Sequence, residues 1–250
     1  MILDERVRAD LAGATRFGDV RFMQVVDSTN RVVLDSARAG EPEGLVLATD
    51  LQTAGRGRLD RTWEAAAGTS LLVSVLLRPA GLAPGSWYLV TAASALAARD
   101  ACENVAGVTA EIKWPNDLLI GERKLAGILA EISGGAVVVG MGLNVHSGPP
   151  GAAYLDEATG RRTSRTALLV AWLNGLDRLM GDWDAVRERY RAACTTVGRR
   201  VRVEQLDGGR LLGRAEGIDD DGRLLVRGPD GVLNLLSVGD VTHLRTEPSG

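Results

Sequence analysis

Residues 52 to 63, QTAGRGRLDRTW, place three arginines and two glycines between two apolar runs in a chain that is acidic overall. Arginine offers a planar fork of donors that matches phosphate and carboxylate groups. Glycine permits positive φ and lets backbone N–H groups approach an anion closely. The segment therefore predicts a compact anion-binding loop built from Gly55, Arg56, Gly57, Arg58 and Arg61, in which Trp63 offers a flat face for a stacked base. The alternative is a solvated arginine loop with Trp63 in the core.

Three familiar phosphate or nucleic-acid motifs do not fit this loop. A P-loop needs a lysine followed by Ser or Thr after its second glycine, and neither lysine of the chain has that neighbour. The dinucleotide fingerprint fails because Asp60 occupies the third glycine position and the loop precedes an expected strand rather than a helix. Binding of single-stranded RNA would favour repeated RGG units and clustered aromatic residues, whereas only 4% of the residues are aromatic.

The lysine content is the second unusual feature. Only two of the 29 basic residues are lysines, and Lys113 and Lys124 both lie in the segment KWPNDLLIGERKLAGILAE. The abundance of Ala, Gly and Arg indicates a bias that replaces lysine wherever arginine serves equally well. A retained lysine then indicates a site that needs a compact point charge rather than a fork, with chance as the alternative.

Composition excludes several classes of protein. A length of 250 residues and 45% hydrophobic content predict a globular protein with a sizeable core and room for a small second domain. A net charge of −3 argues against a protein that coats nucleic acid. No apolar run approaches the roughly 18 residues of a membrane span, and charge appears by the fourth residue, so neither an anchor nor a signal peptide is expected. Two distant cysteines, Cys102 and Cys194, are typical of reduced thiols in a cytoplasm and form no zinc motif.

The hydrophobic pattern predicts a mixed α/β body. A strand ends at Asp27, and Asp27 or Ser28 caps a helix that Gly40 terminates. A further helix is expected to be capped by Ser164. The strands are expected at 44–51, 70–77, 110–114, 117–120, 124–132 and 136–145, and the further helices at 86–105, 164–180 and 182–194.

The pattern of predicted elements changes at about Gly198. Five short strand-like runs are separated by the turn signals DGG, DDDG and PDG, which predicts a small antiparallel barrel of about 50 residues. We therefore expect two domains, residues 1–197 and 198–247. The acidic turn at 219–222 is interpreted as a solvated hairpin.

The arginine-glycine loop, W-P-N-D at 114–117, K-L-A-G-I-L-x-E at 124–131 and GMGLNV at 140–145 occur in this order after DSTN at 27–30. Together they resemble the biotin protein ligases, and the resemblance extends from about residue 20 through the C-terminal segment. It implies an α+β fold: a mixed sheet with packed helices of the class II synthetase type, followed by an SH3-like barrel. It also implies an ATP-dependent ligase that makes biotinyl-5′-AMP and transfers biotin to a lysine of the biotin carboxyl carrier protein of an acyl-CoA carboxylase.

The resemblance also implies roles for individual residues. Lys124 would reach both the biotin carboxylate and the α-phosphate, Arg58 would close over the phosphates, and Asp117 would hold Mg²⁺ or help to deprotonate the incoming amine. The biotin-binding positions are Ser28, Thr29, Asn30, Gln52, Gly55, Arg56, Gly57, Arg58 and Lys124. The ATP and adenylate positions are Arg56, Arg58, Arg61, Trp63, Lys113, Asn116, Lys124 and Asn144.

For several of these residues, the sequence fits a purely structural role as well as the functional one. Ser28 is equally suited to capping a helix, Asp117 and Asn144 to turns, and Gln52 to the surface. Trp114 is assigned to the core. About twenty residues precede the first strand, whereas a repressor-type ligase carries a helix-turn-helix domain of about 60, so no DNA binding is expected. The partners expected are biotin, ATP and the apo carrier domain, for a monomer or weak homodimer. A lipoate-type ligase and a noncatalytic biotin-binding module are the alternatives.

Overall fold

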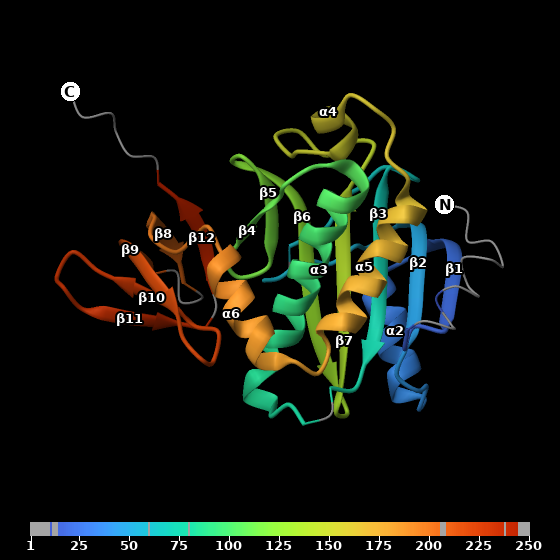
Figure 1. The fold of residues 1–250 in the computed structure, drawn as a ribbon, viewed down its shortest axis with the longest axis horizontal. Helices are drawn as coiled ribbons and strands as arrows, with labels where there is room; N and C mark the ends of the chain where they lie inside the picture. Colours follow the sequence, from blue (N-terminus) through green and yellow to red (C-terminus); the bar gives the residue numbers. More distant parts are fainter. Residues whose placement is uncertain are drawn as a thin grey trace.

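A seven-stranded mixed sheet forms the centre of the computed structural model, in the order β1-β2-β3-β7-β6-β5-β4 (Figure 1). Strands β1 and β2 are parallel, and the other neighbouring strands are antiparallel. The strands are β1 Asp19–Val26, β2 Leu45–Gln52, β3 Ser70–Leu77, β4 Glu111–Lys113, β5 Asp117–Ile120, β6 Arg123–Ser133 and β7 Ala136–Asn144. The structure describes residues 11, 15–59, 61–79, 81–205, 209–237 and 239–244. Asp60 and the first ten residues therefore lie outside the described part.

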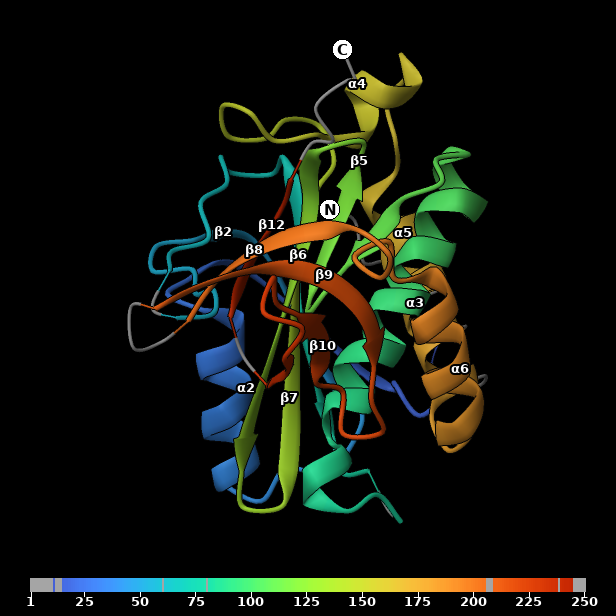
Figure 2. The same cartoon turned by 90° about the vertical axis from the view of Figure 1, so that its left-hand side faces the viewer.

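Helices cover the two faces of this sheet unequally. Figure 2 shows α2 on one side of the sheet and α3, α5 and α6 on the other. Every residue of β3 is buried, because this strand lies between the two helical layers. The part of the α2 side that this helix does not cover faces the arginine-glycine loop and residues of the C-terminal sheet. The helices are α2 Thr29–Arg38, η1 Pro84–Ser86, α3 Tyr88–Ala106, α4 Leu155–Thr159, α5 Arg165–Leu179 and α6 Trp183–Ala193.

The two predicted serine caps behave differently. Ser164 caps α5, since its side chain accepts a hydrogen bond from the backbone N–H of Ala167 at 3.2 Å. Ser28 is the N-cap residue of α2, but within the described residues its side chain makes no capping hydrogen bond. The side chain of Asp27 instead accepts a hydrogen bond from the Ser28 N–H at 2.5 Å. The predicted position of the cap is correct, and the Ser28 hydroxyl is not engaged in capping.

The C-terminal strands form a separate five-stranded antiparallel sheet in the order β11-β10-β9-β8-β12. Its strands are β8 Arg200–Glu204, β9 Arg210–Ile218, β10 Leu224–Arg227, β11 Leu233–Leu236 and β12 Asp240–His243. Buried Val201, Val203 and Val226 belong to the same apolar cluster as the main core. The predicted α+β fold with a small antiparallel C-terminal unit is therefore confirmed, whereas the proposed boundary after residue 197 stays a prediction.

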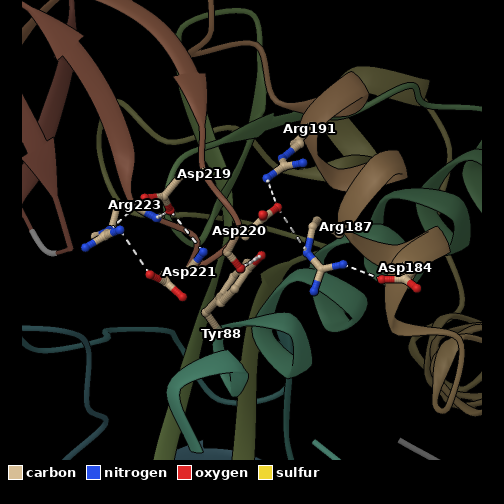
Figure 3. Close-up of polar contacts among 8 residues, drawn as sticks. All are labelled: Tyr88, Asp184, Arg187, Arg191, Asp219, Asp220, Asp221 and Arg223. Carbon is tan, nitrogen blue, oxygen red and sulfur yellow. Dashed lines mark hydrogen bonds and ion pairs between the residues drawn. The ribbon is translucent and has the colours of Figure 1, made fainter. Parts of the chain in front are cut away.

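The acidic turn between β9 and β10 is docked against the main body. Figure 3 shows Asp220 facing Arg187 and Arg191 of α6, and the carboxylate of Asp220 accepts a hydrogen bond from Arg191 at 2.8 Å. The hydroxyl of Tyr88 donates to the carbonyl of Asp220 at 2.9 Å. The indole of Trp114 donates to the carbonyl of Gly222, also at 2.9 Å. The carboxylates of Asp220 and Asp221 are largely exposed, as a solvated hairpin predicts. The interpretation was nevertheless incomplete, because the backbone of the turn is hydrogen-bonded to the main body.

A second polar junction between the domains centres on His243, at the end of β12. Arg199 donates to Nδ1 of His243 at 3.3 Å, so Nε2 carries the proton and donates to the Thr196 hydroxyl at 3.0 Å. The same hydroxyl accepts a hydrogen bond from the backbone N–H of Trp114 at 3.0 Å. Burial, together with the charges of Arg199 and Lys113, lowers the pKa of His243 to about 4.

This shift makes the stability of the protein depend on pH. Because the pKa of His243 is lower in the folded state, the unfolded chain binds more protons between about pH 6.5 and 4. The free energy of unfolding is therefore expected to fall as the pH is lowered through this window. Urea unfolding at several pH values checks this, with His243→Asn as the comparison. If the wild type and the variant lose the same stability between pH 6.5 and 4, the assignment to His243 is wrong.

Candidate active site

The arginine-glycine loop folds as a short hairpin through its own backbone. Arg56 and Thr62 form an isolated antiparallel bridge, and the N–H of Gly57 donates to the carbonyl of Arg61 at 2.7 Å. Leu59 lies near the tip with φ of 55°, a left-handed conformation that is uncommon for leucine. The hairpin therefore presents its arginines on a folded backbone.

The glycines of this loop serve a different purpose from the predicted one. Neither Gly55 nor Gly57 has positive φ, so that part of the prediction is wrong. A Cβ at Gly55 would lie 2.3 Å from the carbonyl oxygen of Trp63, whose N–H donates to the Gly55 carbonyl at 3.0 Å. Glycine is needed at position 55 because two backbone segments approach each other there.

A cavity that is partly open to solvent lies under the hairpin. Its walls come from the start of α2, strands β6 and β7, the β4–β5 turn and the start of β12. Of the predicted site residues, those that line it are Ser28, Thr29, Asn30, Gln52, Arg56, Gly57, Arg58, Arg61, Trp63, Lys113, Asn116, Asp117 and Lys124. Arg58 and Lys124, the two cations on which the prediction depended most, therefore face one cavity.

One end of the cavity is a buried polar pocket. Its base is a hydrogen-bonded chain in which Thr29 donates to the side-chain oxygen of Gln52 from its backbone N–H at 2.8 Å. The Ser74 hydroxyl donates to Oδ1 of Asn30 at 2.6 Å and lies 2.7 Å from the Thr29 hydroxyl. Because the carbonyl of Gln52 is engaged, its amide Nε2 is the end that can donate to a ligand. The pocket thus has fixed polar groups, which give a ligand both orientation and specificity. Ser74, which no sequence pattern singled out, is part of it.

Lys124 also lines the cavity and lies beside a β-bulge. The register between β5 and β6 shifts after Leu118, so that Leu119 pairs with Lys124. Bulges redirect side chains, and here Nζ of Lys124 lies 2.7 Å from the Asp117 carboxylate. It also lies 5.6 Å from the ring centroid of Trp63, within the range of a cation–π contact. Asp117 and Trp63 together hold the ammonium group at the cavity wall.

Arg58 is oriented by the β4–β5 turn. Its guanidinium donates to Oδ1 of Asn116 at 3.2 Å. Asn116 in turn donates from Nδ2 to the carbonyl of Ile128 at 2.6 Å and accepts the Ile128 N–H on its own carbonyl at 2.9 Å. Asn116 therefore extends the β-ladder and aims Arg58 at the same time. Trp114 is 2% exposed, which confirms its place in the core, although it also borders the cavity.

Glycines in β6 and β7 form the cavity floor. A Cβ at Gly142 would lie 2.4 Å from the indole of Trp63, and one at Gly127 would lie 3.1 Å from it. Trp63 therefore lies flat on the sheet, and its buried Nε1 has no hydrogen-bond partner among the described residues. The alternation of glycine with larger residues inside predicted strands, as in GMG at 140–142, was the available signal for this floor.

Other positions differ from the prediction. Gly55 and Asn144 do not belong to the described lining of the cavity. Asn144 is 1% exposed and donates from Nδ2 to the carbonyl of Ala153 at 3.1 Å, while its Oδ1 has no partner among the described residues. Gly239 and Val241 of the C-terminal sheet line the cavity, and no sequence pattern pointed to them. The cavity is therefore shared by both domains.

Comparison with known proteins agrees with this geometry. Residues 22–146 match the Biotin/lipoate A/B protein ligase family, and residues 196–244 match the Biotin protein ligase C terminal domain. The biotin–[acetyl-CoA-carboxylase] ligase of Mycobacterium tuberculosis is 37% identical over 97% of this chain and 96% of its own length. The chain belongs to the biotin protein ligase family.

Two further proteins support this membership. The biotin–[acetyl-CoA-carboxylase] ligase of Paracoccus denitrificans is 34% identical over 82% of this chain and 92% of its own. The solved structure of the Aquifex aeolicus biotin protein ligase, in complex with biotin and ATP, matches with a TM-score of 0.79 at 25% identity, over 92% of this chain and 100% of that one. The chain is thus an enzyme of the ligase class with the biotin ligase fold.

The described residues of this ligase contain no group of three or more His, Cys, Asp or Glu side chains placed to hold a metal ion. A cation that binds mainly through nucleotide phosphates needs only one or two protein carboxylates, and Asp117 offers one at the cavity wall. No described helix is long and apolar enough to cross a membrane. Cys102 and Cys194 are both free and buried, and burial raises the pKa of the Cys102 thiol to about 12.

Proposed function

We propose that this ligase activates biotin with ATP to biotinyl-5′-AMP and then transfers the biotinyl group to a lysine of a biotin carboxyl carrier protein. The observation that carries the proposal is the single cavity in which Lys124 and Arg58 lie beside a buried polar pocket. An apolar acid with a polar ring system fits that pocket, and its carboxylate would then reach the cations. The ligand pair of the Aquifex aeolicus ligase, biotin and ATP, supports this choice.

In the first half-reaction, a carboxylate oxygen of biotin attacks the α-phosphorus of ATP, and pyrophosphate leaves. The two anions repel each other, so the site must position them and stabilise the charge that develops. Lys124 is assigned to the junction of carboxylate and α-phosphate, where a compact point charge contacts both. Arg56, Arg58 and Arg61 would neutralise the phosphates from the hairpin, while Trp63 and Lys113 would border the nucleotide.

In the second half-reaction, the amine of the carrier lysine attacks the carbonyl carbon of the mixed anhydride, and AMP leaves. The amine must lose a proton, and Asp117 is the proposed acceptor at the cavity wall. A closed hairpin would shield the anhydride from water until the carrier arrives. No protein nucleophile is required, so we expect no covalent enzyme intermediate.

Mg²⁺ is part of the proposal as the partner of ATP. When bound, it would neutralise phosphate charge, and Asp117 is the residue proposed to hold it. Asn144 is proposed to contact the adenine. It lies outside the described lining of the cavity, but its buried Oδ1 has no partner among the described residues and is an available acceptor. We further place this enzyme in the cytoplasm as a monomer or weak homodimer that does not bind DNA.

Transfer of radiolabelled biotin tests the function directly. The protein is incubated with MgATP, labelled biotin and an apo carrier domain, and label on the carrier is the expected result. Transfer of lipoate but not biotin would favour a lipoate-type ligase. Tight biotin binding without pyrophosphate release would instead indicate a noncatalytic binding module.

A further inference from the structure

Glu131 contacts both the buried polar pocket and the arginine hairpin. Strand alternation places Gly127, Leu129 and Glu131 on one face of β6, the face on which the cavity lies. One carboxylate oxygen of Glu131 accepts a hydrogen bond from Nδ2 of Asn30 at 2.8 Å. The other forms an ion pair with the guanidinium of Arg56 at 2.9 Å. A single side chain thus bridges the start of α2 and the hairpin.

Asn30 is fixed at every polar atom of its side chain. It is 4% exposed, its Oδ1 accepts from the Ser74 hydroxyl, and its Nδ2 donates to both Glu131 and the carbonyl of Leu129. A buried amide with all its polar atoms engaged cannot rotate without losing hydrogen bonds. Asn30 is therefore a rigid anchor, and through it Glu131 is tied to the chain that ends at Gln52.

Arg56 is held at the other end of the bridge. Its side chain is 48% exposed, whereas that of Glu131 is 19% exposed and also bonded to Asn30, so the carboxylate is the more constrained partner of the pair. An exposed ion pair contributes little to overall stability. Here, its effect is to hold the Arg56 side chain, and with it one arm of the hairpin, close to Asn30 at the polar pocket.

We propose that Glu131 is a positioning residue for biotin binding, which orders the arginine hairpin beside the polar pocket before the ligand arrives, by fixing Arg56 relative to Asn30. The inference rests on the proposed function, because it assigns the polar pocket to biotin. Ordering the hairpin before the ligand arrives lowers the entropy lost on binding. Loss of Glu131 should therefore weaken the binding of biotin more than it slows the chemical step.

The variant Glu131→Gln separates the two contacts. The amide oxygen of glutamine still accepts from Asn30, but the ion pair with Arg56 is lost. We expect the KM for biotin to rise by about tenfold, while kcat for pyrophosphate release changes by less than about threefold. Arg56→Ala should raise the KM at least as much. The double variant should be no worse than Arg56→Ala alone, because the two residues act through one contact.

A matched control is available outside the cavity. Glu157 pairs with Arg123 at 2.9 Å, and the arginine is as exposed as Arg56 although the glutamate is more exposed than Glu131. Glu157→Gln is expected to leave the KM for biotin unchanged. The Kd for biotin, measured by calorimetry, repeats the comparison without turnover, so it tests Glu131 even if the wild type releases no pyrophosphate and the proposed reaction fails. An unchanged KM and Kd in Glu131→Gln, or additive effects in the double variant, would overturn the inference.

Discussion

Replacing Lys124 with alanine is expected to lower the rate of biotin-dependent pyrophosphate release by about 10²–10³-fold. The ammonium group lies at the cavity wall, 2.7 Å from Asp117, and is the proposed link between carboxylate and α-phosphate. Without it, two anions must meet with less compensating charge, and Asp117 adds an unpaired negative charge beside them. The measurement is the steady-state release of pyrophosphate at saturating biotin and ATP.

Two comparisons make this test specific. Lys124→Arg keeps the positive charge but replaces the point donor with a fork, and we expect it to recover only a small part of the activity. Thermal unfolding of both variants should stay close to that of the wild type, because the pair with Asp117 is partly exposed. Near-normal pyrophosphate release by Lys124→Ala would refute the assigned role.

Gly140→Ala is expected to damage both the fold and the binding of biotin. A Cβ at position 140 would lie 2.1 Å from Oδ1 of Asn30 and 3.2 Å from the Ser74 hydroxyl. Asn30 cannot move aside without breaking buried hydrogen bonds. We therefore expect the free energy of unfolding to fall by about 1–3 kcal/mol and the KM for biotin to rise at least tenfold. Urea unfolding and pyrophosphate-release kinetics measure the two effects.

Gly217→Ala is the matched control, since this glycine also lies inside a strand but a Cβ there would meet only Leu225 at 3.6 Å, an ordinary contact. It should leave the KM for biotin unchanged and alter stability by less than about 1 kcal/mol. If Gly140→Ala behaves like Gly217→Ala in both measurements, the contact between Gly140 and Asn30 is not important for the pocket.

The local elements were predictable because each has a periodic apolar pattern or a defined end. Strand β3 is one uninterrupted apolar run, and α3 is a long alanine-rich segment that ends at Gly107 in the left-handed conformation. The order of strands was not predictable, because β7 pairs not only with its sequence neighbour β6 but also with β3, which is distant in sequence. The docking of the acidic turn on α6 was missed for the same reason.

The site was predictable where residue type alone limits the chemistry. Arginines grouped around glycines, and two lysines retained in an arginine-rich chain, identified the cationic wall. Ser74 was not identified, and Glu131 appeared only as the last residue of the K-L-A-G-I-L-x-E motif, with no role. The role of either residue becomes visible only when the fold places it beside Asn30. The conformation of Gly55 was predicted wrongly because a close backbone approach and a positive φ both call for glycine.

The sharing of the cavity between two domains has a consequence for biosynthesis. Gly239 and Val241 complete its wall, and they are among the last described residues to be synthesised. A nascent chain that already contains the central sheet, the hairpin and Lys124 still lacks this part of the wall. Because domains fold roughly in the order in which they leave the ribosome, the catalytic pocket of a growing chain stays incomplete until β12 has emerged and docked.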